Sequence, residues 1–285
     1  MKIYLDCIPC FLRQTIESAR LTTDDELVHE SITREVLRLT AEMDMDQSPP
    51  AIGQQIHRLI RSLAGNDDPY RTLKEKYNIM AMRLYSELAK KVRESINPIE
   101  SAIRLAIAGN IIDLGVKTSL NESEVEDIIR KSLYQAFDNT DFDEFCGEID
   151  KARDILYLAD NAGEIVFDRL LIELLPLEKI TVVVKGYPVI NDATMQDAEF
   201  VGLTAITDVI DNGSDAPGTI LETCSQRFQA RFEQADLIIA KGQGNYETLS
   251  NSSKKIFFIL KTKCPVIAKD LSCDIGTMVL RKGRF

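Results

Sequence analysis

Polar and charged residues follow each of five short apolar runs in the second half of the chain. Asp160 and Asn161 follow the first run, Asp192 lies in the segment after the second, and Lys241 follows the fourth. Carboxylate and amide oxygens are hard ligands that suit Mg²⁺ or Mn²⁺ rather than zinc. A lysine followed closely by two glycines suits a phosphate, because it adds a point charge beside backbone N–H groups that an anion can approach. These residues predict a divalent metal next to a bound phosphate.

The same loops offer further residues for binding a substrate. Lys185, directly after the second run, is a second candidate cation, and Glu164, Asn191, Gly242 and Asn245 are candidates for substrate contacts. A local explanation competes with this one, in which Asp160 or Asn161 caps the following helix and Thr194 caps the next. Convergence of several polar loops on one edge favours a site over separate local roles.

The elements that must position these loops are short strands alternating with helices. Each run is four to six residues long and rich in Val, Ile or Leu, and the five runs are Ile155–Ala159, Ile180–Val184, Ala205–Ile210, Leu237–Ala240 and Ile256–Leu260. Amphipathic stretches lie between several of them, at 163–177, 194–201, 217–234 and 245–252. This alternation predicts βαβ units and a mostly parallel sheet of about five strands in a Rossmann-like α/β/α core. Ligands of such sheets bind beyond the carboxyl ends of the strands, where these loops lie.

The first half of the chain has a helical pattern instead. Apolar residues recur at helical spacing in six segments, 7–20, 24–44, 50–63, 70–95, 98–108 and 122–137. The segment from Ile103 to Ala108 is the most apolar, so we expect its helix to be central. We therefore divide the chain into a helical domain, 1–145, and a Rossmann-like α/β domain, 146–285, which carries the metal site. No flexible linker separates them, so we expect the helical part to dock on the sheet.

Composition excludes several classes of protein. The 285 residues carry a net charge of −11, which argues against a nucleic-acid partner because such binding requires basic surface. No apolar run approaches the length of a membrane span, and the first residues lack a signal-peptide pattern, so we expect a cytoplasmic protein that binds no membrane. The sequence makes no prediction about oligomeric state.

The chain has six cysteines, at positions 7, 10, 146, 224, 264 and 273. We expect no disulfide framework among them in a cytosolic chain of this size. Cys7 and Cys10 form a CxxC motif, for which metal binding, redox activity and coincidence are the alternatives. One hypothesis is a second metal or redox site formed by Cys7, Cys10 and Cys264. The other is that the CxxC cysteines are two small buried residues on a helix, since two cysteines do not complete a tetrahedral site.

Other catalytic motifs are absent from the sequence. No GxGxxG follows a strand, and there is neither a GxxxxGK(S/T) loop nor a GxSxG elbow. His29 and His57 are isolated on helical stretches, which argues against histidine-based catalysis.

Seven segments in order resemble the metal-dependent damage-control phosphatases, particularly the branch with an N-terminal CxxC. These segments are MKIYLDCIPC at the start, GNDDPY at 65–70, AGNIIDLG at 108–115, LADNAGE at 158–164, NDAT at 191–194, AKGQGNYETL at 240–249 and KCPVIA at 263–268. The resemblance implies a metal held by Asp160, Asn161 and Asp192 and a phosphate contact from Lys241. It also implies that Asn110 and Asp113, of a GNxxD segment, lie beside the site.

The reaction implied by the resemblance is hydrolysis of phosphate monoesters on sugars or other small metabolites, with Mg²⁺, Mn²⁺, Co²⁺ or Ni²⁺ as the metal. The predicted catalytic residues are Asp160, Asn161, Asp192 and Lys241. The absence of a DxDx(T/V) motif favours attack by water over an aspartyl-phosphate route. Two alternatives remain: a carboxyl methyltransferase that uses S-adenosylmethionine, and a sugar-phosphate sensor without catalysis.

Overall fold

Five parallel strands form the centre of the fold in the computed structural model, which describes residues 1–111 and 131–284. They are β2 (Ile155–Leu158), β3 (Ile180–Val184), β4 (Asp208–Asp211), β5 (Leu237–Lys241) and β6 (Ile256–Lys261). In the register of the sheet, Tyr157 of β2 lies between Val182 of β3 and Ile239 of β5. The side chains of β2, β3 and β5 are buried along their whole length, as expected for strands covered on both faces.

The sheet is wider than the five predicted strands. Two more strands, β1 (Phe137–Asp138) and β7 (Met278–Lys282), extend it to seven in the order β1-β7-β6-β5-β2-β3-β4. β7 runs antiparallel to β6, and β1 is parallel to β7. Neither strand has a clear signal in the sequence, because β1 has only two residues and β7 ends in two basic residues that leave only a short apolar run.

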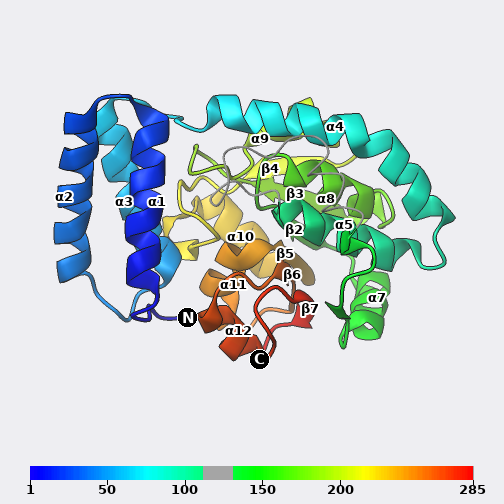
Figure 1. The fold of residues 1–285 in the computed structure, drawn as a ribbon. Coiled ribbons are helices and arrows are strands. Elements are labelled where there is room, and N and C mark those ends of the chain that lie inside the picture. The colour runs from blue at the N-terminus through cyan, green and yellow to red at the C-terminus, as the bar shows by residue number, and fades with distance from the viewer. Residues whose placement is uncertain (112–130, 285) are drawn as a thin grey trace.

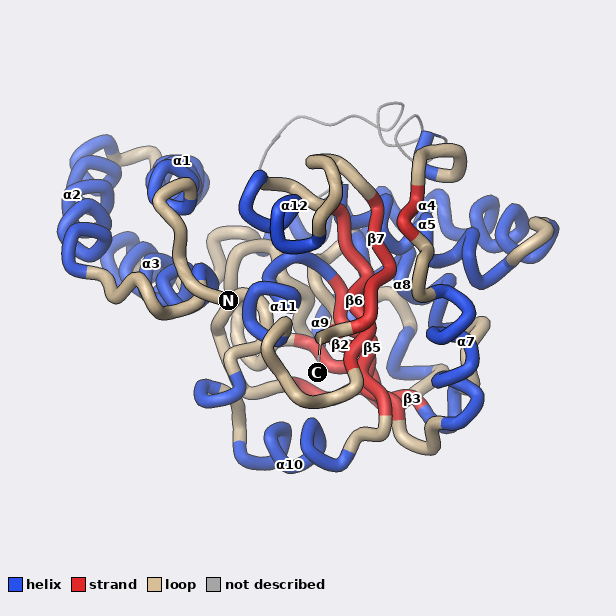
Figure 2. The backbone as a smooth tube through the Cα atoms, turned by 90° about the horizontal axis from the view of Figure 1, so that it is seen from below, coloured by secondary structure: helices blue, strands red, loops and turns tan. Residues whose placement is uncertain are grey.

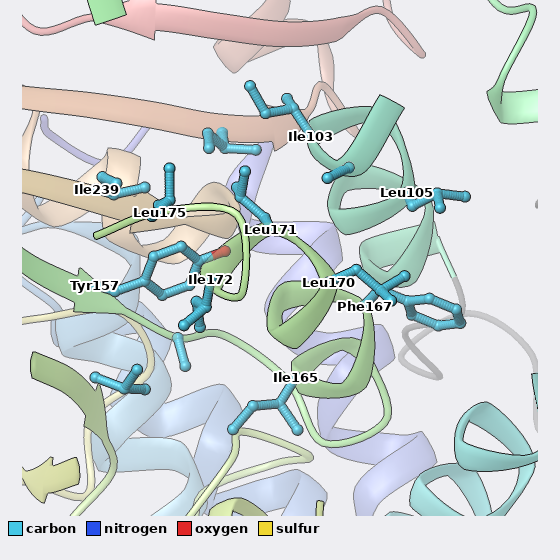
Figure 3. Packing of buried hydrophobic residues seen from close by; sticks show 14 of the residues in the cluster. Ile103, Leu105, Tyr157, Ile165, Phe167, Leu170, Leu171, Ile172, Leu175 and Ile239 are labelled. Carbon is cyan, nitrogen blue, oxygen red and sulfur yellow. The ribbon is translucent and has the colours of Figure 1, made fainter. Parts of the chain in front are cut away.

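Helices cover both faces of this sheet, which gives the predicted α/β/α layers (Figure 2). On one face lie α5 (Pro98–Ile111), α7 (Phe142–Lys151) and α8 (Glu164–Ile172), and on the other lie α10 (Gln226–Gln234), α11 (Gly242–Leu249) and α12 (Pro265–Leu271). Figure 3 shows α5 and α8 side by side, with Ile103 and Leu105 of α5 near Phe167, Leu170 and Leu171 of α8. The predicted central position of the 98–108 helix is therefore confirmed.

The first helices form a separate layer beside the sheet (Figure 1). They are α1 (Cys7–Thr22), α2 (Glu26–Glu42) and α3 (Pro49–Ala64), and they enclose a hydrophobic core of their own. The next helix, α4 (Arg71–Glu94), packs instead with α5 and α8 in the core that covers the sheet. Every regular element within residues 1–111 is a helix, as predicted. The division of the chain into domains at residue 145 stays a prediction.

Two predicted elements begin later in the chain than expected, and a third is mostly not described. The predicted helix at 217–234 begins only at Gln226, because Ser225 caps it by accepting a hydrogen bond from the N–H of Phe228. The predicted strand at 205–210 begins at Asp208, after a short 3₁₀ turn at Leu203–Ala205. The predicted helix at 122–137 lies mostly outside the described residues. Helix α9 (Met195–Phe200) matches the prediction, and Thr194 caps it. None of the helices described is long and apolar enough to span a bilayer.

Candidate active site

The loops after β2 and β5 meet where the strand order of the sheet reverses. From β2 the chain continues to β3 and β4 on one side, whereas β5 and β6 lie on the other. Such a switch point is where open α/β sheets bind ligands, beyond the carboxyl ends of the strands. Two helices, α8 and α11, begin at this point, so the positive ends of their dipoles lie at the same edge.

Gly242 allows these two loops to approach closely. Its φ is +80°, and a Cβ atom at this position would lie 1.8 Å from Oδ2 of Asp160. No side chain fits there, because real Cβ atoms do not approach an oxygen at that distance. Gly242 therefore serves the packing of Asp160 against the start of α11, which is a backbone role beside the predicted substrate role.

Backbone hydrogen bonds join the Asp160–Asn161 loop to the Asp192 loop. The N–H of Ala193 donates to the carbonyl of Asp160 over 2.8 Å, and the N–H of Ala162 donates to the carbonyl of Asn191 over 2.8 Å. Asn161 and Asp192 thus face each other in an antiparallel bridge. Directly opposed residues of such a bridge have Cβ atoms about 4.5–5.5 Å apart. The structure therefore brings together the residues that the sequence analysis predicted as metal ligands.

The carboxamide of Asn161 has a defined orientation. Its Nδ2 donates to Oδ2 of Asp160 over 2.9 Å and to Oε2 of Glu164 over 3.1 Å. Both hydrogens of the amide group are thereby used, so Oδ1 is the atom left to bind a cation. Two carboxylates and one amide oxygen fit a hard divalent ion such as Mg²⁺ or Mn²⁺.

Lys185 lies next to Asp192, as predicted for a cation at this edge. Its Nζ is 3.3 Å from Oδ2 of Asp192 and also donates to the carbonyl of Gly218. The side chains of Lys185 and Asp192 are both buried, at 4% and 6% exposed. A positive charge is thus held within reach of a candidate metal ligand and links the loops after β3 and β4.

Lys241 lies beneath the candidate site rather than at its surface. Its ammonium donates to Oε1 of Glu164 over 2.5 Å, to Oδ1 of Asp168 over 2.6 Å and to the carbonyl of Ala106 over 3.0 Å. All three N–H groups have protein acceptors, and the side chain is fully buried. The structure therefore does not support the predicted direct contact with phosphate, which would require these hydrogen bonds to break. That contact stays a prediction.

Two carboxylates share the single ammonium of Lys241. Burial opposes the charge on Lys241, but the carboxylates of Asp168 and Glu164 raise its pKa above the ordinary lysine value. Burial raises the pKa of Glu164 to about 7 and also raises the pKa of Asp168, which in addition accepts a hydrogen bond from the hydroxyl of Tyr157 over 2.9 Å. One ammonium cannot neutralise two carboxylates, so this buried cluster favours retaining a proton.

Other predicted substrate residues also have internal roles. The side chain of Asn245 donates to the carbonyl of Lys241 over 2.7 Å and accepts from the hydroxyl of Thr219 over 2.7 Å. Glu164 is buried against Lys241 and Asn161, and Asn191 is buried as well. Asn245 and Glu164 are thus bound to protein groups next to the candidate metal ligands, and their contacts with substrate stay predictions.

The predicted pair Asn110 and Asp113 is only partly described. Asn110 lies in the last turn of α5, and Asp113 lies outside the described residues. A Cβ atom on the preceding Gly109 would lie 2.7 Å from the ring of Phe167 and 3.0 Å from Cα of Glu164. The end of α5 therefore touches the start of α8, beside the candidate site.

One residue important for the site was not predicted. Asn78 of α4 accepts a hydrogen bond from the N–H of Gly163 over 2.6 Å and donates to Oδ1 of Asp197 over 2.7 Å. It thus fixes the turn between Asn161 and α8. No local pattern marks Asn78, whereas the T-x-x-D spacing of Thr194 and Asp197 was a signal for the capping box that holds α9.

The cysteines of the proposed second site come from two distant parts of the chain. Cys7 and Cys10 begin α1, Cys264 precedes α12, and Sγ of Cys264 accepts a 3.7 Å hydrogen bond from Gln243. Cys7 and Cys264 are half-buried, and burial raises the pKa of both thiols, which argues against a reactive thiolate. Cys10 is exposed, so the hypothesis that the CxxC cysteines are two buried residues is wrong for Cys10. Within residues 1–111 and 131–284 no three His, Cys, Asp or Glu side chains are grouped to hold a metal ion. A metal or redox role for these cysteines stays a prediction.

The amino-acid sequence is similar to a family of known proteins over nearly its whole length. Residues 3–279 match the model of the damage-control phosphatase ARMT1-like domain. Damage-control phosphatases of Pyrococcus horikoshii and Archaeoglobus fulgidus are each 35% identical to the chain and align over at least 99% of both sequences. An uncharacterised protein of Methanocaldococcus jannaschii is 39% identical over 99% of the chain and 96% of its own length.

The fold has a match among solved structures as well. The crystal structure of a DUF89 family protein from Pyrococcus horikoshii aligns over the full length of both chains, with a TM-score of 0.88 and 33% identity. The sequence match and the structural match thus agree over nearly all residues, including every loop of the candidate site. The chain belongs to the damage-control phosphatase ARMT1-like family.

Proposed function

We propose that this protein is a metal-dependent phosphatase that hydrolyses phosphate monoesters of small metabolites, such as sugar phosphates or damaged phosphometabolites. The observation that carries the proposal is the meeting of Asp160, Asn161 and Asp192 at the switch point of the sheet. The names of the relatives, damage-control phosphatases, support a phosphatase. The metal is our inference from the residues of the site, and the class of substrate is the one that the family resemblance implies.

Asp160, Asn161 and Asp192 would hold the metal, and Mg²⁺, Mn²⁺, Co²⁺ and Ni²⁺ are the candidates. A divalent ion in such a site supplies charge that polarises a phosphoryl oxygen. The protein supplies the orientation of the ligands, since the Asn161 amide is fixed by hydrogen bonds to Asp160 and Glu164. A carboxylate of Asp160 or Asp192 is also suited to orient a water molecule for attack.

Positive charge for the phosphate has two sources at this edge. Lys185 is held beside Asp192, and the first-turn N–H groups of α8 and α11 face the same end of the sheet. Phosphoryl transfer depends mainly on positioning and on neutralising negative charge, so these groups suit the reaction. This local field offsets the acidic surface implied by the net charge of −11. Six free cysteines fit a reducing compartment, so we place the reaction in the cytoplasm.

A hydrolysis screen tests the proposal. Purified protein is incubated with small phosphate monoesters and each of the four metals, and released phosphate is measured against a chelator-treated sample. We expect metal-dependent turnover that Asp192→Asn abolishes. Asp211→Asn is the matched control, because Asp211 also lies at the end of a strand but is exposed and only accepts from the N–H of Gly213.

The outcomes separate the alternatives. Turnover that survives both chelation and Asp192→Asn would contradict the metal site. Substrate binding without phosphate release would indicate a sensor, and methyl transfer from S-adenosylmethionine to a carboxylate in a parallel assay would indicate a methyltransferase.

A further inference from the structure

The loop that carries Asp192 has no regular secondary structure to hold it. It connects β3 to α9. Its two ends are bound by backbone hydrogen bonds, Gly186 and Tyr187 to the loop after β4 and Asn191 and Ala193 to the loop after β2. The described backbone hydrogen bonds link none of residues 188–190 to another loop. Ile190, two residues before Asp192, has a φ of +46°, which is rare and strained for a β-branched residue. Strained backbone persists only where surrounding contacts hold it, so the middle of this loop requires support from another element.

Helix α3 supplies that support through Arg61. Its Nη1 donates to the carbonyl of Pro188 over 3.0 Å, at the start of the strained segment. The same guanidinium donates from Nη2 to Oδ2 of Asp215 over 2.5 Å. Arg61 also lines a cavity of about 10 Å³ together with His57, Val189 and Ile190, so α3 packs directly against this segment.

The second contact of Arg61 leads back to Asp192 by another route. Asp215 lies in the loop after β4, and three residues later the carbonyl of Gly218 accepts a hydrogen bond from Lys185. Lys185 is the residue whose ammonium pairs with Asp192. Arg61 therefore contacts both supports of this carboxylate, which are the backbone of its own loop and the loop that holds its lysine partner.

We propose that Arg61 is a positioning residue for Asp192, acting from the N-terminal helices on the candidate metal site. The proposal rests on the proposed function for its effect on metal binding, but its effect on the loop is independent of any metal. The side chain is 16% exposed, and both of its acceptors lie in loops at the carboxyl edge of the sheet. The three-helix layer thus sets the geometry of a site to which it contributes no ligand.

Arg58 offers a matched control on the same helix. It donates to both carboxylate oxygens of Asp215, over 2.8 Å from Nε and 2.6 Å from Nη2. It therefore makes more hydrogen bonds to Asp215 than Arg61 does, and no described hydrogen bond links it to the Asp192 loop. If Arg61→Met acted only by loosening Asp215, Arg58→Met should have at least as large an effect on the Asp192 loop.

The test compares Arg61→Met, Arg61→Lys and Arg58→Met with the wild type. Without metal, hydrogen exchange of the amides of residues 186–193 should accelerate about tenfold in Arg61→Met, because local opening becomes easier, and stay near the wild-type rate in Arg58→Met. Mn²⁺ affinity should fall by about tenfold or more in Arg61→Met, the size expected when a partner that orients a ligand is lost. The exchange rates and the Mn²⁺ affinity of Arg61→Lys should lie between those of the wild type and Arg61→Met, because one ammonium cannot span both acceptors.

Equal exchange in the wild type and Arg61→Met would overturn the proposal, and so would equal acceleration in Arg61→Met and Arg58→Met. If Arg61→Met does not fold, as judged by circular dichroism, the exchange rates of Arg61→Lys decide. A wild type that binds no Mn²⁺ would contradict the proposed function, while the exchange data would still decide whether Arg61 positions the loop.

Discussion

Nζ of Lys241 lies 2.5 Å from Oε1 of Glu164, and both side chains are completely buried. Oε2 of the same carboxylate accepts a hydrogen bond from Asn161, whose amide also donates to Asp160. A continuous chain of hydrogen bonds thus runs from the buried ammonium to two candidate metal ligands. Lys241 can therefore influence the site by holding Glu164, without contacting a substrate.

The first prediction separates this role from phosphate binding. Lys241→Met should leave Glu164 and Asp168 as unneutralised buried carboxylates and lower the free energy of unfolding by about 3–5 kcal/mol. Urea denaturation measures the change. Adding Glu164→Gln to the variant should restore part of the loss by removing one buried charge. Unchanged stability combined with a raised KM for phosphate esters would instead favour direct contact with phosphate.

The second prediction concerns Gly242. Gly242→Ala places a Cβ atom where Oδ2 of Asp160 now lies and strains a backbone with a φ of +80°. We expect a loss of about 1–3 kcal/mol in stability from backbone strain and a large loss of hydrolytic activity as Asp160 moves. Gly147→Ala is the control, because a Cβ atom there meets nothing within 4 Å and the residue lies inside helix α7. Gly147→Ala should leave the stability unchanged or raise it slightly. A Gly242→Ala variant as active as this control would show that hydrolysis does not depend on the position of Asp160.

The third prediction is a thermal shift on metal binding. A ligand that binds only the folded state stabilises it by about 2.7 kcal/mol at a hundred times its Kd, so saturating Mn²⁺ should raise the Tm and a chelator should reverse the rise. Asp192→Asn should lose this shift, whereas Asp211→Asn should keep it. A shift that persists unchanged in Asp192→Asn places the metal elsewhere in the protein.

The fourth prediction is a pH dependence caused by His57. Burial, with a smaller effect from Arg61, lowers the pKa of His57 to about 3 in the folded protein, against an ordinary value of 6.5. Between these values the unfolded state binds a proton that the folded state does not, so stability decreases as the pH falls below 6.5 and continues to decrease towards 3.

The size of this effect follows from the linkage. At pH 5 the loss attributable to His57 is about 2 kcal/mol relative to pH 8. His57→Gln should remove it, so the difference in unfolding free energy between the two pH values should shrink by that amount. An identical difference in His57→Gln and the wild type would mean that His57 is not buried as a neutral residue.

Much of the fold could be predicted from local patterns. Helical periodicity located α1–α5 to within a few residues, because amphipathic helices carry a repeated signal over several turns. The parallel strands were marked by short runs of branched apolar residues. The strands β1 and β7 could not be predicted, because β1 is too short and β7 combines apolar with basic residues, so neither has such a signal.

The order of strands and polar loops along the sequence already indicates which side chains lie near the carboxyl edge of the sheet. Residues that directly follow a parallel strand must lie at the carboxyl end of the sheet, which places Asp160 and Asn161 there. Asp192 lies eight residues beyond the end of β3, and backbone hydrogen bonds between the two loops bring it to Asn161. Family resemblance supplied the reaction, which no pattern of strands and loops specifies.

The contacts of those side chains are apparent only in the folded protein. Lys241 precedes two glycines, as a phosphate-binding lysine does, yet its partners Glu164 and Asp168 lie 77 and 73 residues away on the first turns of α8. Asn78 reaches Gly163 across 85 residues, and Arg61 reaches Asp215 across 154. Local sequence specifies the conformation of a segment, whereas the partner of a buried charge depends on which distant elements pack against it. Burying an unpaired charge is so costly that the packing determines the role of Lys241.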